Sequence, residues 1–303
     1  MISRSSRSPS FVKPPLARQR TLAQPASVGG FGYWSGKDVQ VEFRPAALGS
    51  GVVFVRSDLP RPTAIPVSVQ QRVEVPRRTA LAQAGASVEM VEHILAALYG
   101  LGIDNCEIHV TGQEMPGCDG SALPFVEAIA AAGIVEQPAC KRRLVVTEVT
   151  RVGNDECWVE ARPGQPGQLQ IKYRLDYGND TAIGRQTIEL VVDSDAFCRE
   201  LAPARTFLLE EEAQWLRSRG LGSRVTNRDL LVYGPEGVID NELRFEDECV
   251  RHKALDLVGD LALAGCSILG QITAYKSGHR LNAELVKVLL KEGRLEEGLR
   301  RSA

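Results

Sequence analysis

Apolar and polar residues alternate with a period of two in several short stretches of the chain. Between Asp38 and Pro45, for example, Val39, Val41 and Phe43 fall on one side. Such alternation over a few residues is typical of a strand with one buried face. The pattern predicts strands over residues 38–45, 52–55, 106–110, 144–149, 158–162, 169–175 and 188–192.

Other stretches follow the period of a helix. Between Ser87 and Gly102, apolar residues recur at intervals of three and four positions, and Gly100 and Gly102 are typical stop signals. We expect three further helices, over residues 123–132, from 244 to about 265, and over about 282–291. The apolar stripe of the first predicted helix consists of Val88, Val91, Ile94, Leu95, Leu98 and Leu101.

Strands and helices are mixed in both halves of the chain, without the strict alternation that builds a parallel α/β sheet. Periodicity is lost between Gly133 and Arg143, a stretch that contains Pro138. We therefore predict an α+β protein of two domains, residues 19–138 and 139–303, after a disordered basic tail at residues 1–18. A length of 303 residues agrees with two domains of roughly 100–200 residues each.

Composition and charge exclude several classes of protein. The formal net charge is -2, so the basic excess typical of nucleic-acid-binding proteins is absent. No apolar run approaches the roughly 18–20 residues that a membrane span needs. The seven cysteines include no CxxC pair, which argues against a disulfide framework and favours a reducing compartment. Acid–base or metal chemistry must draw on a short set of histidines: His93, His109, His252 and His279.

The most informative spacing lies in the helix predicted after Arg244. His252, Asp256 and Asp260 are four residues apart and share one helix face within an apolar run. Two interpretations remain open on the spacing alone. The row is either a solvated stripe with a His–Asp hydrogen bond, or part of a metal site, because a buried carboxylate requires a partner or an ion.

Three further residues could take part in acid–base or metal chemistry. Glu92 and His93 are adjacent on the first predicted helix, and His279 follows Gly278 just before the last one, whereas His109 falls on the polar face of its strand. Taken singly, Glu92 and His93 are better explained as a surface carboxylate and a core histidine, and His279 could be an exposed loop histidine. Taken together, two histidines and one aspartate would make a catalytic zinc site with an open position, Glu92 a general base and His279 a general acid. The reaction would be hydrolysis of an amide or ester.

Longer motifs around these residues resemble one family, from about Gln19 to Arg294. The resemblance is to the UDP-3-O-acyl-N-acetylglucosamine deacetylases, which catalyse the committed step of lipid A synthesis. The motifs that carry it are Val91-Glu92-His93, Leu101-Gly102-Ile103-Asp104-Asn105, Asp119-Gly120-Ser121, Arg205-Thr206-Phe207, Leu243-Arg244-Phe245-Glu246-Asp247-Glu248, His252-Lys253-Ala254-Leu255-Asp256 and Lys276-Ser277-Gly278-His279.

The resemblance implies a metal centre. His93, His252 and Asp256 correspond to the three zinc ligands of the family, and the same donor set is compatible with Fe²⁺. Glu92 corresponds to the general base. His279, in its protonated form, corresponds to the residue that assists the leaving amine and the developing oxyanion.

Four more residues acquire roles through the same resemblance. Asp260 would orient and charge His279, and Thr206 would hydrogen-bond the reacting carbonyl or its oxyanion. Lys253 and Phe207 would contact the substrate, with Lys253 near the diphosphate.

The resemblance also implies a fold and an inserted segment. The family has two domains of similar topology, each a helix layer on a sheet, packed helix layer to helix layer with the site between them. A segment corresponding to about residues 207–240 forms a hydrophobic passage for the acyl chain of the substrate. Candidate lining residues here are Trp215, Leu216, Leu221, Leu230 and Leu231.

Three stretches depart from the family pattern. The loop Gly30–Gly36 carries Trp34 where a histidine is usual, Leu208-Leu209 replaces Gly-Phe, and Gly222-Ser223-Arg224 replaces a Gly-Gly-Ser-like stretch. We therefore expect altered substrate contacts and an acyl passage of different shape.

The resemblance further predicts a monomer that acts on UDP-3-O-acyl-N-acetylglucosamine in the cytoplasm, close to the inner face of the membrane because the substrate is acylated. Two alternatives remain. One is a related metal-dependent amidase that acts on another acylated amine, and the other is a binding protein that keeps the fold without catalysis.

Overall fold

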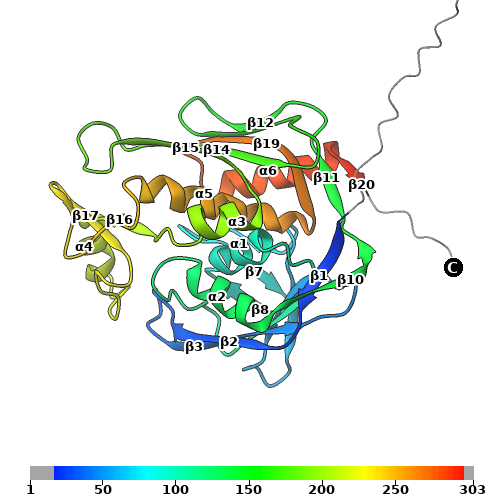
Figure 1. Ribbon diagram of the computed structural model, residues 1–303. Helices are drawn as coiled ribbons and strands as arrows, with labels where there is room; N and C mark the ends of the chain where they lie inside the picture. The colour runs from blue at the N-terminus through cyan, green and yellow to red at the C-terminus, as the bar shows by residue number, and fades with distance from the viewer. Residues whose placement is uncertain (1–16, 297–303) are drawn as a thin grey trace, which may run out of the picture.

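The computed structural model describes residues 17–296, so residues 1–16 of the predicted tail lie outside the described part of the chain. Two layers of helices lie between two β-sheets (Figure 1). The sheet at the bottom of the view comes from the first half of the chain, and the sheet at the top comes from the second half.

The first half builds its sheet and helices in the following order. The strands are β1 (Arg18–Leu22), β2 (Ala26–Phe31), β3 (Asp38–Pro45), β4 (Val52–Arg56), β5 (Thr63–Pro66), β6 (Arg72–Val73), β7 (Ala80–Gln83), β8 (Ala86–Glu89), β9 (Cys106–Val110) and β10 (Ile134–Cys140). The helices are α1 (Glu92–Gly100) and α2 (Leu123–Ala132).

The second half follows the same plan with an added segment. Its strands are β11 (Arg143–Val145), β12 (Thr150–Gly153), β13 (Trp158–Arg162), β14 (Leu169–Asp176), β15 (Arg185–Val191), β16 (Phe207–Leu209), β17 (Leu231–Gly234), β18 (Gly237–Val238), β19 (Ser267–Tyr275) and β20 (Arg294–Glu296). Its helices are α3 (Ser194–Ala196), the π-helix η1 (Phe197–Leu201), α4 (Glu210–Ser218), α5 (Glu248–Leu261), the 3-10 helix η2 (Ala262–Ala264) and α6 (His279–Glu292).

The two main sheets share one topology. The first has the order β2-β3-β9-β4-β5, and the second contains β12-β13-β19-β14-β15. In each, a parallel pair at the centre (β4 with β9, β14 with β19) is flanked by antiparallel partners. The predicted α+β fold with two similar halves is confirmed.

Each half buries the apolar face of its sheet beneath its own helices. In β3, for example, Val39, Val41 and Phe43 are buried while the residues between them are more exposed, as the alternation predicts. The buried faces of α1 and α5 then meet at the centre of the molecule. The functional candidates on these two helices are therefore placed together by the packing of the helix layers.

Several predicted element bounds are wrong. The first helix begins at Glu92, not Ser87, because residues 86–89 pair with β7 as strand β8 and Met90 then adopts a left-handed conformation with φ of 57°. The last helix begins at His279 instead of about residue 282, so His279 is its first residue. The strand predicted over residues 144–149 ends at Val145.

Two features bear on the predicted domain division. The boundary expected between residues 138 and 139 falls inside β10, which pairs with β1 as far as Cys140. Residues 207–238 form a separate unit, in which β16, β17 and β18 make a small sheet beside α4 (Figure 1, left). We call this unit the insert.

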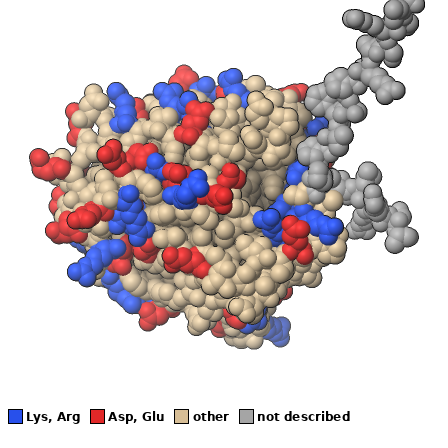
Figure 2. All heavy atoms as spheres, viewed as in Figure 1, with Lys and Arg blue, Asp and Glu red and all other residues tan. Residues whose placement is uncertain are grey.

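Basic and acidic side chains are interspersed over the face shown in Figure 2, in keeping with the near-neutral net charge. Among residues 17–296, no helix is long and apolar enough to cross a bilayer.

Candidate active site

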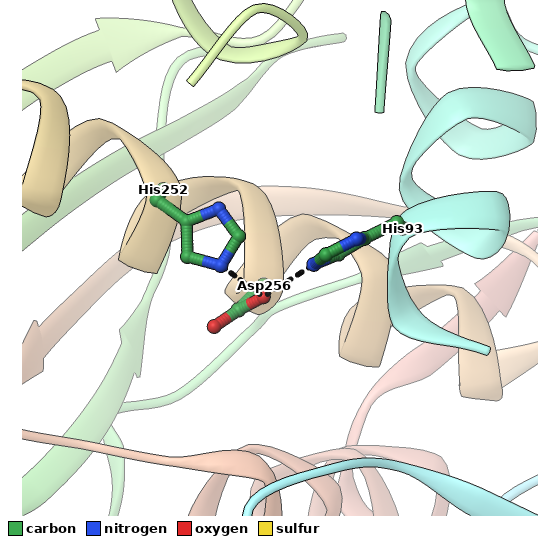
Figure 3. A group of neighbouring side chains, drawn as sticks. All are labelled: His93, His252 and Asp256. Carbon is green, nitrogen blue, oxygen red and sulfur yellow. Dashed lines mark ion pairs between the residues drawn. The ribbon is translucent and has the colours of Figure 1, made fainter. Parts of the chain in front are cut away.

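Three of the predicted site residues converge between α1 and α5. His93 comes from the first turn of α1, and His252 and Asp256 lie one turn apart on α5 (Figure 3). Their ligand atoms all lie within 4.8 Å of one another and all three side chains are buried. Asp256 Oδ1 is 3.7 Å from His93 Nε2 and 3.4 Å from His252 Nε2. The row at 252 and 256 is therefore not a solvated stripe.

A glycine on α5 permits this meeting of the two helices. A Cβ atom at Gly259 would lie 2.2 Å from the backbone oxygen of Glu92, far inside van der Waals contact. Close approach of the backbones brings His93, one residue after Glu92, within reach of the α5 ligands. The geometry of the site thus depends on Gly259, a residue that has no functional group of its own.

The loop before the insert fixes one imidazole. His252 Nδ1 lies 3.1 Å from the backbone oxygen of Ala204, so Nδ1 carries the ring proton and donates a hydrogen bond to that oxygen, and Nε2 faces the centre of the site. Arg205 holds this loop through a buried ion pair with Glu248, in which Nε donates to Oε1 at 2.8 Å. Such outer partners fix the tautomer and orientation of a metal-binding histidine.

The protonation states of the three residues suit a cation. Burial and the neighbouring His252 lower the pKa of His93 to about 3, and burial likewise lowers the pKa of His252. Burial alone would raise the pKa of Asp256, but Lys253 and the surrounding histidines hold it below its usual range. Two neutral imidazoles and one carboxylate, with room for further ligands, form a donor set that fits zinc.

Lys253 is attached to this cluster. Its Nζ donates to Asp256 Oδ2 at 2.8 Å and lies 5.8 Å from the centre of the Phe207 ring. Burial lowers the pKa of Lys253, but Asp256 and Tyr173 outweigh it and raise the pKa above the usual value. The residue is therefore a fixed positive charge beside the site, half-buried and lining the cavity described below.

Glu92 is buried at the first position of α1. Its Oε2 accepts a hydrogen bond from the backbone N–H of Thr79 at 2.9 Å. Burial raises the pKa of Glu92 to about 7, against the opposing effect of His279. A carboxylate with a pKa near neutrality is suited to accept and release a proton at physiological pH.

His279 belongs to a second polar cluster at the start of α6. Its Nδ1 lies 2.9 Å from Oδ2 of the fully buried Asp260, and that oxygen also accepts from Asn282 Nδ2 at 2.8 Å. Thr79 Oγ1 donates to the other oxygen, Oδ1, at 2.6 Å. Burial lowers the pKa of His279, but Asp260 outweighs it, and together with Glu92 and Asp256 raises the pKa to about 9.

Both clusters open into one cavity of about 510 Å³. Its lining includes the metal-site residues with Glu92, Lys253 and His279, and Thr206 and Phe207 line the same space. Thr206 is held there by its backbone N–H, which donates to the oxygen of Gly120 at 2.8 Å. Phe207 packs its ring against Tyr177 and His252, with ring centres 5.9 and 6.3 Å apart.

The insert supplies the apolar wall of this cavity, as the sequence predicts for Leu216, Leu221 and Leu230. The prediction is wrong for two residues. Trp215 is 52% exposed on the outer face of α4, and Leu231 points into the core from β17. Within the insert, the pattern missed Leu208, Ala213, Val225 and Val232, and outside it the lining also includes Tyr33, Met90, Tyr177 and Leu281.

Sequence reasoning also missed two side chains that connect the catalytic candidates. Thr79 contacts both Glu92 and Asp260, and Asn282 contacts Asp260. Asn282 carried a weak signal, because it lies one turn after His279 on an apolar helix. Thr79 carried none, since it belongs to no motif and is separated from Asp260 by 181 positions in the sequence. His109, which the alternation places on the polar face of its strand, lies on β9 with its Nε2 3.1 Å from Glu107 Oε2.

Comparison with known proteins agrees with this geometry. Residues 19–291 match the model of the LpxC family, described as UDP-3-O-acyl N-acetylglycosamine deacetylase. The UDP-3-O-acyl-N-acetylglucosamine deacetylase of Myxococcus xanthus is 37% identical over 282 residues, which cover 93% of this chain and 89% of that protein. The proteins of the same name from Shewanella sp. W3-18-1 and Shewanella baltica OS155 are each 39% identical over 280 residues, 90% of this chain and 89% of theirs.

Proposed function

Because the chain belongs to the family of UDP-3-O-acyl-N-acetylglucosamine deacetylases, we propose that its buried cluster catalyses zinc-dependent removal of the N-acetyl group from that substrate. Acetate would be released, in the committed step of lipid A biosynthesis. The observation that carries the proposal is the convergence of His93, His252 and Asp256 with Glu92 and His279 at one end of a single cavity.

The cluster would hold zinc through His93 Nε2, His252 Nε2 and a carboxylate oxygen of Asp256. Two nitrogens and one oxygen with an open position are the ligand set of catalytic zinc sites, and Fe²⁺ fits the same donors. When bound, the ion supplies a nucleophilic water near neutral pH and polarises the carbonyl under attack.

The chain's own residues would perform the proton transfers. Glu92, with its pKa near 7, accepts the proton of the attacking water as general base. His279, which Asp260 keeps charged, donates to the developing oxyanion and then to the leaving amine. Thr206 lines the same cavity, and its hydroxyl would donate a hydrogen bond to the same oxygen.

The shape of the cavity supports an acylated sugar as substrate. The metal-site residues line the cavity together with Glu92 and His279, and the insert adds apolar side chains beside the charged Glu212 and Arg217. The acetamide would therefore lie at the metal-site residues and the acyl chain against the apolar side chains of the insert. Lys253 and Phe207 line the same cavity, 5.8 Å from each other, and would contact the substrate, with Lys253 facing its negative charge. A monomer in the cytoplasm, working close to the inner face of the membrane, would meet this acylated nucleotide sugar.

Acetate release from UDP-3-O-acyl-N-acetylglucosamine tests this proposal. Metal-free protein should be inactive and should regain turnover with one equivalent of zinc. The variant Asp256→Ala should bind zinc more weakly and lose turnover, whereas Glu107→Ala, on a strand away from the cavity, should behave as the wild type. Turnover without any metal, or full zinc retention by Asp256→Ala, would overturn the assignment.

A second candidate is hydrolysis of another acylated amine. It is favoured by Trp34, which lines the cavity at the position where the family usually has histidine, and by the altered lining of the insert. A panel of N-acetylated sugars with and without the UDP and acyl groups distinguishes the two. A binding protein without catalysis is disfavoured, because burial of Glu92 and Asp260 without a reaction to serve would only cost stability.

A further inference from the structure

Two of the stretches in which this chain departs from the family pattern contact each other. Arg224 of the insert donates through Nη1 to the backbone oxygen of Gly36 and to Asp38 Oδ1, each at 2.7 Å. Its guanidinium carbon also lies 4.3 Å from the centre of the Phe31 ring. The partners lie at the turn between β2 and β3, which reaches toward the end of the insert in Figure 1.

That turn is anchored firmly to the first half of the molecule. Glu114 accepts hydrogen bonds from the backbone N–H groups of Trp34 and Ser35, at 2.7 and 2.8 Å. Gly32 is needed for this contact, since a Cβ atom there would lie 2.4 Å from Glu114 Oε2. Gly36 has φ of +67°, a conformation that glycine adopts without strain. Arg224 therefore attaches the insert to a fixed partner.

Other contacts hold the insert in the same place. The hydroxyl of Tyr33 donates to the backbone oxygen of Asp229 in the insert, and its ring packs over Gly117, where a Cβ atom would lie 1.9 Å away. Across the cavity, Arg77 Nη2 donates to Glu212 Oε1 at 2.8 Å, but both side chains are substantially exposed and the pair is screened by salt.

These contacts decide whether one wall of the cavity is closed. Tyr33 from the turn, and Leu221 and Val225 on either side of Arg224, all line the cavity. Glu92, the ligands and His279 are instead held by the packing of α1, α5 and α6. Loss of the attachment would open the wall near the insert and leave the reacting groups in place.

We propose that Arg224 is a positioning residue that clasps the insert to the β2–β3 turn, and that this clasp sets the affinity for acylated substrates and the discrimination among acyl-chain lengths. The inference rests on the proposed function, because the apolar wall is taken as the binding site of the acyl chain. The contact joins the two altered stretches, residues 30–36 and 222–224, so the position of the β2–β3 turn affects the shape of the cavity.

The three partners of Arg224 contribute unequally. The Arg224 side chain is 47% exposed and that of Asp38 is 84% exposed, so the ion pair between them contributes little in water. The bond to the Gly36 carbonyl and the stacking on Phe31 therefore carry the clasp. This difference provides a matched control, because Asp38→Asn removes the ion pair and keeps both other contacts.

The experiment compares Arg224→Gln with Asp38→Asn on substrates whose 3-O-acyl chains increase in length. For Arg224→Gln we expect KM to rise roughly tenfold with kcat within about twofold, and the dependence of kcat/KM on chain length to flatten. Arg224→Lys should be intermediate, since its ammonium can bond Gly36 but stacks poorly on Phe31. Asp38→Asn should resemble the wild type.

Binding of a fluorescent fatty acid separates this inference from the proposed function. If the wild type binds the fatty acid without deacetylating the substrate, and Arg224→Gln binds it more weakly, the clasp stands and the proposed function fails. Unchanged fatty-acid binding and an unchanged length profile in Arg224→Gln would overturn the clasp. A fall in kcat together with a lower Tm in Arg224→Gln would also overturn it, because that result would indicate a general structural role.

Discussion

At the scale of single residues, the environment gives two titratable groups of the site distinct tasks. Glu92 is buried and the His279 side chain is 11% exposed, but only His279 has a buried carboxylate, Asp260, hydrogen-bonded to its ring. Burial therefore makes Glu92 a base with a pKa of about 7, and Asp260 keeps His279 charged up to about pH 9. Distinct pKa values set by environment are the usual basis for assigning acid and base.

The carboxylate of Glu92 is expected to act as the general base. Glu92→Gln keeps the shape of the side chain and can still accept the hydrogen bond from Thr79, but it cannot take a proton. We expect kcat to fall by about 10²–10⁴-fold with zinc content unchanged. Steady-state kinetics together with metal analysis of the same preparation check this. A variant of near wild-type rate would remove Glu92 from the role of base.

The dependence of activity on pH follows from Glu92 and His279. Activity should rise as Glu92 loses its proton near pH 7 and fall as His279 loses its proton near pH 9. Asp260→Asn removes the charge that raises the pKa of His279, so the falling limb of kcat/KM should move to lower pH. Asn282→Ala, which leaves the carboxylate charged, should not move it in that direction. A falling limb in the same place for Asp260→Asn would contradict the role given to this carboxylate.

At the scale of elements, the site depends on how closely α5 approaches α1. The ligands on α5 are placed by its periodicity, but their distance to His93 is set by the contact between Gly259 and the backbone of Glu92. The loop after η1 adds a second constraint, because the Arg205–Glu248 pair holds the carbonyl of Ala204 against His252.

A substitution at Gly259 tests the first constraint. Gly259→Ala places a Cβ atom 2.2 Å from the Glu92 oxygen, so the helices must separate. We expect a loss of about 1–3 kcal/mol in the free energy of unfolding, as for other overpacked cores, and weaker zinc binding. Denaturant unfolding and zinc titration measure both. Gly29→Ala is the control, because Gly29 is exposed on β2 and an added Cβ atom there has no other atom within 4 Å. It should change neither the free energy of unfolding nor the affinity for zinc.

At the scale of the whole molecule, the site joins the two halves of the chain. His93 belongs to the first half and His252 and Asp256 to the second, so a bound ion would bridge the two helix layers. The cavity is likewise shared, with one wall from the β2–β3 turn and another from the insert. Ligand binding and the mutual packing of the halves are therefore coupled.

Thermal unfolding checks this coupling. A ligand that binds only the folded protein stabilises it by about 2.7 kcal/mol at one hundred times its Kd. Removal of zinc with a chelator should therefore lower Tm, and re-addition should restore it. His93→Ala should lose most of this zinc-dependent rise, whereas His279→Gln, outside the ligand set, should keep it. Equal zinc-dependent shifts in His93→Ala and the wild type would contradict the bridge.

The sequence determined much of this protein by itself, because local periodicity and spacing are physical properties of a short segment. Alternation predicted β3, β9 and β13 with their observed bounds, and the four-residue spacing placed His252 and Asp256 on one face of α5. The small number of histidines and their neighbours made Glu92, His93 and His279 candidates, and the family motifs assigned their roles. Local pattern failed at residues 86–89, where pairing with β7 outweighed helical periodicity.

Only the tertiary structure decided how these parts meet, because contacts between distant segments leave no local signal. Thr79, which contacts Glu92 and Asp260, belongs to no motif, and Trp215 could be separated from Leu216 as an exposed residue only once α4 was placed on the cavity. The contact of Arg224 with Gly36, 188 residues apart, likewise depends on docking of the insert against the first half. Sequence specifies which groups are present and on which faces, and packing of the two halves specifies which of them touch.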